Sequence, residues 1–98
     1  MGMYKLKILP RDFSQLESQL AEISQKYDLI RINSDMDYCI IQENKFMKEM
    51  KHFVVKELPN SQPKIELLLN EMYENGYDVK FINDYSVIFT EIDRTKFR

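Results

Sequence analysis

Hydrophobic and polar residues alternate at the start of the chain, a pattern typical of a β-strand with one buried face. Tyr4, Leu6 and Ile8 are separated by lysines, so one side of the strand is apolar and the other is charged. Pro10 follows and ends the strand, because proline lacks the backbone N–H that a sheet ladder requires. The pattern predicts a half-buried strand that ends before Pro10.

Two later stretches repeat apolar residues at helical spacing, and each predicts an amphipathic helix with one apolar face. The first begins near Asp12 or Ser14, and Ser14 with Glu17 fits a capping box. The second begins at Pro63 and ends at Gly76, because glycine accepts the left-handed backbone that follows many helices. The two apolar faces consist of Phe13, Leu16, Leu20, Ile23 and Tyr27, and of Ile65, Leu68, Leu69, Met72 and Tyr73.

The chain contains two diverged copies of one arrangement. Tyr27–Asn33 matches Tyr77–Asn83, and the apolar run Asp37–Ile41 matches Asp84–Ile88. In each copy a helix pattern precedes these matches, and a strand ending in Leu-Pro precedes the helix. The same landmarks in the same order predict a duplicated strand–helix–strand–strand (βαββ) unit.

We therefore predict a single α+β domain, a tandem βαββ repeat with a mostly antiparallel sheet and two helices packed on one face. The first unit spans residues 3–43, and the second spans residues 53–92 and is followed by a short C-terminal tail. Residues 44–52 connect the units, and their pattern leaves open whether they form a turn of helix or a strand extension. No Gly/Ser-rich linker separates the units, so we expect them to pack as one body.

The second copy carries the better-defined pattern, Leu-Asn, five residues, Gly, Tyr, Asp and Val over residues 69–79, followed by a hairpin that contains Val87 and Phe89. It resembles small bacterial and phage βαββ domains of unknown function, whose helix ends in the same way. The first copy departs from this pattern, with Lys26 in place of the glycine. The resemblance implies a βαββ unit and a bacterial, phage or mobile-element origin, and it carries no catalytic residue.

Composition and charge limit the classes of function. The 14 basic and 16 acidic residues give a formal net charge of -2, without the positive excess typical of proteins that grip a phosphate backbone. Cys39 is the single cysteine, which suits a reducing compartment because no intramolecular disulfide can form. No apolar run is long enough for a signal peptide or a membrane span. We predict a cytoplasmic protein without membrane contact.

Candidate catalytic and metal-binding groups are few, so we predict no enzyme activity, no cofactor and no metal site. Cys39 lies in an apolar run, distant in sequence from the single histidine, His52, and we expect a buried thiol rather than a nucleophile. Residues 33–37 have the acidic spacing of the first half of a calcium loop, but Tyr38 stands where that loop needs glycine. We expect a polar hairpin tip there.

Both hairpins contain strands that are apolar on both faces, within Tyr38–Ile41 and Tyr85–Phe89. Such strands are normally buried on both faces, whereas the helices cover only one. The second face then requires a second copy of the chain, another protein, or packing of the two units within one chain. We prefer a homodimer that acts as an interaction or regulatory module and binds a protein partner. The predicted contact residues are Tyr38, Ile40, Tyr85, Val87 and Phe89.

An alternative is binding of nucleic acid by the connector and the C-terminal tail, where basic residues lie near phenylalanines in the sequence. Charged runs of this kind more often form a solvated surface, so this alternative ranks second. Its contact residues are Lys45, Lys48, Lys51, His52, Arg94, Lys96 and Arg98. A third, more remote alternative is a small-molecule pocket between sheet and helices.

Overall fold

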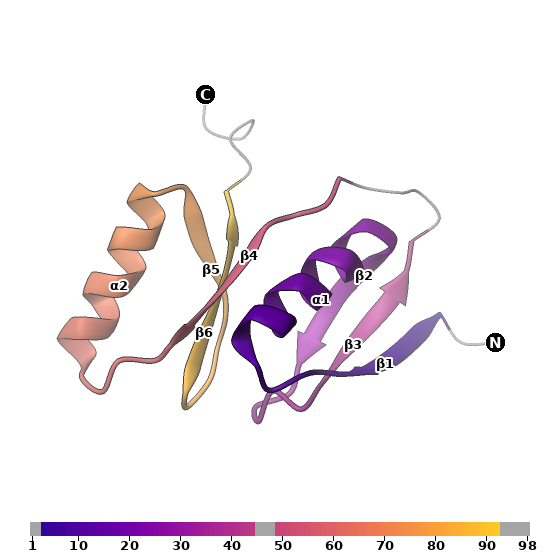
Figure 1. The fold of residues 1–98 in the computed structure, drawn as a ribbon, viewed down its shortest axis with the longest axis horizontal. Coiled ribbons are helices and arrows are strands. Elements are labelled where there is room, and N and C mark those ends of the chain that lie inside the picture. The colour runs from indigo at the N-terminus through magenta and orange to yellow at the C-terminus, as the bar shows by residue number, and fades with distance from the viewer. Residues whose placement is uncertain (1–2, 45–48, 93–98) are drawn as a thin grey trace.

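The computed structural model describes residues 3–44 and 49–92, and the order of its elements repeats once along the chain (Figure 1). The first unit consists of β1 (Tyr4–Ile8), α1 (Phe13–Lys26), β2 (Tyr27–Ile32) and β3 (Tyr38–Glu43). The second consists of β4 (Phe53–Glu57), α2 (Gln62–Glu74), β5 (Tyr77–Ile82) and β6 (Ser86–Glu91). The predicted α+β fold with a tandem βαββ repeat is confirmed.

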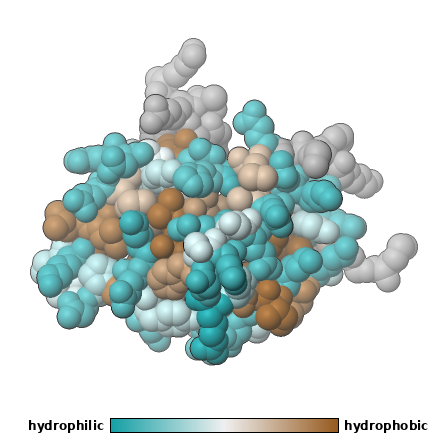
Figure 2. Space-filling model, viewed as in Figure 1, coloured by the Kyte–Doolittle hydropathy of each residue, from teal (hydrophilic) through white to brown (hydrophobic). Residues whose placement is uncertain are grey.

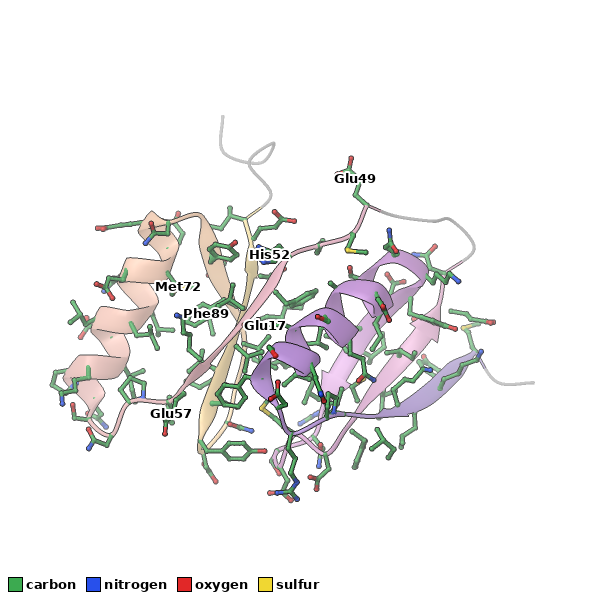
Figure 3. The ribbon with its side chains drawn as sticks, in the orientation of Figure 1. Glu17, Glu49, His52, Glu57, Met72 and Phe89 are labelled. Atoms are coloured by element: carbon green, nitrogen blue, oxygen red, sulfur yellow. The ribbon has the colours of Figure 1, made fainter. Side chains whose placement is uncertain are left out.

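The six strands form two antiparallel sheets of three strands each. The strand order is β1-β3-β2 in the first, which we call sheet A, and β4-β6-β5 in the second, sheet B. This differs from the predicted single sheet with both helices on one face. The physical reason lies at β4, where α1 covers the edge that would have continued the sheet. The Val55 N–H at that edge donates to the Glu17 carboxylate at 2.7 Å (Figure 3).

The two units use the same strand register, including a β-bulge at the same place. The bulge lies between Leu29 and Arg31 in β2 and between Val79 and Phe81 in β5. A bulge bends its strand and increases the local twist. The two copies therefore have equivalent backbones, and each residue of one unit can be compared with its counterpart in the other.

The sequence match aligned Tyr38 with Tyr85, but the strand pairing shifts this alignment of the two hairpins by one residue. Ile8 and Glu57 stand at the same distance before the Leu-Pro ends of β1 and β4. Tyr38 pairs with Ile8, and Ser86 pairs with Glu57, so Tyr38 and Ser86 are counterparts. Tyr85 precedes β6 and lies in the turn, because the second hairpin has the shorter turn.

The helix ends follow local signals in the sequence. Asp12 caps α1, and its side chain accepts hydrogen bonds from the Gln15 N–H at 3.0 Å and the Ser14 hydroxyl at 2.8 Å. The predicted capping box is replaced by this bond network, since Glu17 bonds to β4. At the end of α2, Gly76 has φ 92°, a left-handed conformation that costs glycine nothing.

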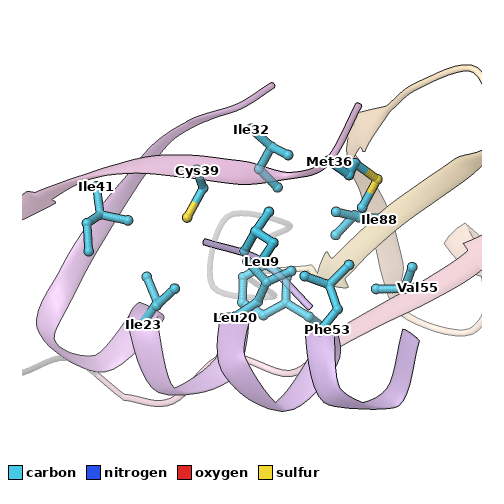
Figure 4. Close-up of a cluster of buried hydrophobic side chains, with 11 residues drawn as sticks. Leu9, Leu20, Ile23, Ile32, Met36, Cys39, Ile41, Phe53, Val55 and Ile88 are labelled. Carbon is cyan, nitrogen blue, oxygen red and sulfur yellow. The ribbon is translucent and has the colours of Figure 1, made fainter. Parts of the chain in front are cut away.

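One hydrophobic cluster joins the two units. Helix α1 contributes its apolar face to the cluster, sheet A packs above it, and sheet B closes the side (Figure 4). The backbone N–H of Lys51 also donates to the Ser24 hydroxyl of α1 at 3.0 Å. Residues of both units therefore pack in the same cluster. The members are Leu9, Leu16, Leu20, Ile23, Ile32, Met36, Cys39, Ile41, Phe53, Val55 and Ile88.

Candidate functional site

Sheet A leaves uncovered the face that points away from α1, and β1 and β3 contribute mostly apolar side chains to it, whereas β2 contributes Arg31. Strand pairing places Tyr4, Leu6 and Ile8 opposite Gln42, Ile40 and Tyr38 on that face. The exposed fractions of the β1 side chains are 60% for Tyr4, 57% for Leu6 and 71% for Ile8. Figure 2 shows hydrophobic side chains gathered along the lower right of the molecule, at the position of β1. We call Tyr4, Leu6, Ile8, Tyr38 and Ile40 the head face.

The orientation of β1 is the reverse of the one expected for a half-buried strand. Lys5 and Lys7 pair with core residues of β3 and therefore point toward the helix side, while the apolar side chains point to solvent. The Lys5 ammonium lies 3.5 Å from the Glu43 carboxylate and 5.6 Å from the centre of the Tyr27 ring. All five residues of β1 are exposed, because β1 is an edge strand and α1 packs over β2 and toward β4 instead.

The outer edge of β1 is a poor template for adding another strand. The backbone N–H of Glu43 donates to the Met3 carbonyl, and the backbone carbonyl of Asp37 accepts from the Leu9 N–H. The backbone groups of the odd-numbered β1 residues therefore bond to β3, and those of the even-numbered residues face outward. The outward Ile8 carbonyl already accepts from the Gln19 side chain at 3.1 Å. A second β1 strand would also bring lysines close to lysines, which is a common protection of sheet edges. The head face, rather than this edge, is the candidate surface.

Sheet B has the equivalent face, but unit one buries it. Phe53 and Val55 stand where unit one has Tyr4 and Leu6, and they are only 3% and 5% exposed. Of the three ways to cover a second sheet face, packing within the chain therefore applies to sheet B. Sheet A keeps its face open, so the exposed apolar sheet face is confined to unit one.

Two of the predicted contact residues are corrected by this packing. Val87 and Phe89 have no exposed surface, because they lie on the side of sheet B that α2 covers, where Figure 3 also shows Met72. They cannot contact a partner. Their strand is apolar on both faces because α2 covers one and unit one covers the other.

The remaining predicted contact residues divide between two places. Tyr38 and Ile40 are half-buried on the head face. Tyr85 is 47% exposed, but its hydroxyl donates to the Asp35 carbonyl, which fastens the two hairpin tips together. Asn83 adds a bond from its side-chain amide to the Ser34 carbonyl at 3.0 Å. Tyr85 thus joins the two units of one chain.

The sequence pattern did not predict that the β1 residues of the head face are exposed, although a comparison of the two copies provides a signal for it. Val54 of β4 pairs with the fully buried Phe89 and is half-buried toward α2. Lys5 is its counterpart in β1. An apolar residue replaced by lysine on the helix side indicates that this side of β1 is outside the core, which leaves Leu6 and its neighbours facing solvent.

The thiol of Cys39 is fully buried, and the prediction of a buried cysteine is confirmed. Burial raises the pKa of Cys39 to about 11, because the apolar surroundings disfavour the thiolate. A protonated thiol is a weak nucleophile. His52 is engaged elsewhere, with its Nδ1 atom 2.6 Å from the Tyr77 hydroxyl.

The tip of the first hairpin has the structure of a polar turn. The Asn33 side-chain oxygen accepts from the backbone N–H groups of Asp37 at 2.8 Å and Tyr38 at 2.9 Å. Met36 has φ 57° and places its side chain in the core. Within residues 3–44 and 49–92, no three His, Cys, Asp or Glu side chains gather in a way that would hold a metal ion.

The basic residues of the nucleic-acid alternative fall mostly outside the described residues, namely Lys45, Lys48, Arg94, Lys96 and Arg98. Lys51 and His52 are exposed, and the described connector residues, 44 and 49–52, belong to neither a helix nor a strand. The backbone N–H of His52 donates to the Glu91 carboxylate at 3.1 Å. The described part of the connector is therefore held by hydrogen bonds to both units.

A surface hollow of about 850 Å³ lies along the outer side of α1. Its lining is mostly polar and includes Gln15, Gln19, Glu22 and Lys26. A small-molecule site is normally a concave, mostly apolar pocket with a few polar groups, and this hollow does not have that composition.

In the described residues, no helix has the length and apolar character needed to cross a membrane.

No family model, curated protein or solved structure matches the chain. The resemblance to small bacterial and phage βαββ domains therefore stays a prediction.

Proposed function

We propose that this protein is a non-enzymatic interaction module that binds protein through its head face, and that the partner is a second copy of the chain. One observation carries the proposal. Tyr4, Leu6 and Ile8 are each more than half exposed, while the counterparts of Tyr4 and Leu6 in unit two are buried. Contiguous apolar surface of this kind is typical of protein interaction sites.

The size of the head face indicates how strongly it binds alone. Strands lie about 4.8 Å apart and rise about 3.3 Å per residue, so three strands of five residues present roughly 240 Å² in projection. Two such faces in contact cover roughly 500 Å². A stable complex buries about 1,200–2,000 Å² of total accessible surface. The head face alone therefore supports weak, reversible association, and a tighter complex needs a second surface.

Other features are consistent with a binding role. The buried thiol of Cys39 and the polar turn at residues 33–38 provide no reactive group at the head face. A location in the cytoplasm and an origin in a phage or mobile element belong to the same proposal. They rest on the single cysteine and on the resemblance of the second copy.

Sedimentation velocity over a wide range of protein concentration tests the proposal. We expect the average mass of the wild-type protein to rise with concentration, and the Leu6→Glu variant to remain monomeric. Leu6 is 57% exposed, so this substitution should leave the fold intact, as circular dichroism will verify.

Leu67→Glu is the matched control, because Leu67 is a leucine of α2 with 63% exposure that lies away from the head face. It should associate as the wild type does. A wild-type protein that stays monomeric at the highest concentration would count against self-association. If Leu6→Glu associated as the wild type does, the head face would be the wrong surface.

A further inference from the structure

We infer that copies of the chain associate head to tail, with the head face of one copy seated against α2 and β5 of the next. The contact would repeat the packing that unit two already makes on unit one within the chain. This inference rests on the proposed function and specifies the surface that the head face binds.

The contact inside the chain supplies the template. Sheet B places Phe53, Val55 and Ile88 against the opening between α1 and β2 of unit one (Figure 4). At this opening Leu20 and Ile32 are only 1% and 8% exposed. The contact therefore has two halves, a sheet face from one unit and a helix–strand opening from the other.

The first half of the contact is repeated, without a partner, at the head face. Tyr4 and Leu6 are the counterparts of Phe53 and Val55, and strand pairing makes Ile40 the counterpart of Ile88. The β1 pair is 60% and 57% exposed, whereas the β4 pair is 3% and 5% exposed. Unit one thus carries a sheet face of the kind that unit two has already buried.

The second half is repeated, also without a partner, on unit two. Counterparts in the helices follow from their first hydrogen bonds, in which Leu16 donates to Asp12 and Ile65 donates to Ser61. This alignment makes Glu66 the counterpart of Glu17. Helix α1 has four buried residues, whereas α2 has none. The outer side of α2 therefore lacks the cover that unit two gives to α1.

Exposure at matched positions locates this uncovered opening. Tyr73 is 51% exposed and its counterpart Ser24 is 9% exposed, while Ile82 is 54% exposed and its counterpart Ile32 is 8% exposed. Val79, at 41% exposure, lies between them. We call Tyr73, Val79 and Ile82, together with Glu66, the tail face. The head face and the tail face are the two halves of one contact, left open at opposite ends of the tandem repeat.

A hydrogen bond within the chain shows how the register of the contact is set. The Glu17 carboxylate accepts from the outward N–H of Val55 at 2.7 Å. The corresponding N–H of Leu6 faces outward on the free edge of β1, as the pairing of the odd-numbered residues requires. Glu66 of the next copy occupies the position from which a carboxylate can accept this bond.

Charge favours the same pairing. Strand β1 carries Lys5 and Lys7 and no acid, whereas α2 carries Glu66, Glu71 and Glu74 against one lysine. Complementary charge fixes orientation and speeds encounter more than it adds affinity. A face-to-face dimer would instead place Arg31 of the open face near Arg31 of the other copy.

One position differs from the contact within the chain, and it should weaken the contact between two copies. Arg31 stands on the open face of sheet A where unit two has Phe81, which packs against the core cluster. A charged side chain at this position loses apolar contact, so association between copies is weaker than packing within the chain. Because the contact is heterologous, each added copy leaves one head and one tail open, and assemblies grow as chains or close as rings.

A mixing experiment tests the inference. Leu6→Glu disables the head face and Ile82→Glu disables the tail face, and each variant alone should be monomeric by sedimentation velocity. Mixed in equal amounts, they should form a 1:1 dimer that does not grow with concentration, since each supplies the half that the other lacks. The Leu67→Glu control should form the same assemblies as the wild type, because its counterpart Ser18 is exposed in unit one.

Other outcomes separate the two proposals. If Ile82→Glu still dimerises while Leu6→Glu does not, the dimer is face to face, and the head-to-tail inference fails while the proposed function stands. If the wild type is monomeric throughout, both fail. If Ile82→Glu is unfolded by circular dichroism, Tyr73→Glu on the surface of α2 takes its place in the mixture.

Discussion

The two aromatic residues at matched positions of the repeat provide a direct test of the packing between the units. Phe53 is 3% exposed and Tyr4 is 60% exposed, although both begin the first strand of their unit. Replacing each by alanine removes an aromatic ring from the same backbone environment. Only the ring of Phe53 lies between the units, so the two substitutions should have very different effects on stability.

The magnitudes follow from burial. Phe→Ala in a core costs about 3–5 kcal/mol, through lost transfer free energy and the cavity that remains. Tyr4 has less than half of its surface buried, and at about 1.5–3 kcal/mol for full burial of a large side chain, its loss should cost about 1 kcal/mol. We therefore expect the free energy of unfolding to fall at least about twice as much for Phe53→Ala as for Tyr4→Ala.

Urea denaturation followed by far-ultraviolet circular dichroism measures both values. The protein concentration must be low enough for the chain to be monomeric, because self-association adds apparent stability. Equal losses for the two variants would refute the assignment of a buried contact to sheet B and an open face to sheet A. Such a result would also remove the basis for head-to-tail association, which is the buried contact between the two units.

Three further predictions concern single groups. Glu17→Ala should lower the free energy of unfolding by about 1–3 kcal/mol, because the Val55 N–H loses its acceptor, and denaturation midpoints will measure the loss. Cys39 should react with a thiol reagent at neutral pH only as fast as the chain opens, since its pKa is raised to about 11 by burial; rapid labelling of the folded protein would contradict this. Bonds from Gln15 and Ser14 lower the pKa of Asp12 below its ordinary 3.8. The stabilising effect of ionised Asp12 should therefore be complete above that pH and be lost as pH falls through the lowered value, and Asp12→Asn should remove this pH dependence from acid denaturation curves.

The repeat and its elements could be predicted because they depend on local patterns. Asp12, Pro63 and Gly76 mark helix ends through backbone chemistry that acts within a few residues. The period of the apolar residues then fixes which side of each helix is buried. The signals at the helix ends differ between the copies, with Asp12 at the start of α1 and Pro63 and Gly76 in the second unit, yet each acts locally and the described elements follow them.

The separation into two sheets could not be predicted in the same way. Whether β4 continues sheet A or faces it depends on contacts between residues far apart in sequence, such as Glu17 with Val55. For the same reason the apolar pattern of β6 did not distinguish a cover within the chain from a cover by a partner. The pattern predicts a partner surface for Val87 and Phe89, which α2 buries, and a buried face for the apolar side of β1, which is exposed.

Ionic strength distinguishes the two arrangements of a dimer without any change to the protein. Arg31 lies on the open face of sheet A, whereas Lys5 and Lys7 of β1 point to the other face, toward the helix side. Face-to-face packing brings Arg31 near its own copy, so added salt should screen repulsion and strengthen association. Head-to-tail packing brings Arg31 near the glutamates of α2, so added salt should weaken association.

The Glu66→Gln variant makes this test specific to one residue. It should reduce the salt dependence of association, because it removes one of the charges that faces the head face, whereas Glu22→Gln on α1 should leave the dependence unchanged. Glu22 is exposed and lies on neither surface. Sedimentation equilibrium at about 0.05 M and 0.5 M NaCl spans Debye lengths from above 10 Å to below 5 Å. Association that strengthens with salt over this range would exclude the head-to-tail arrangement, since the same charges cannot both attract and repel across one contact.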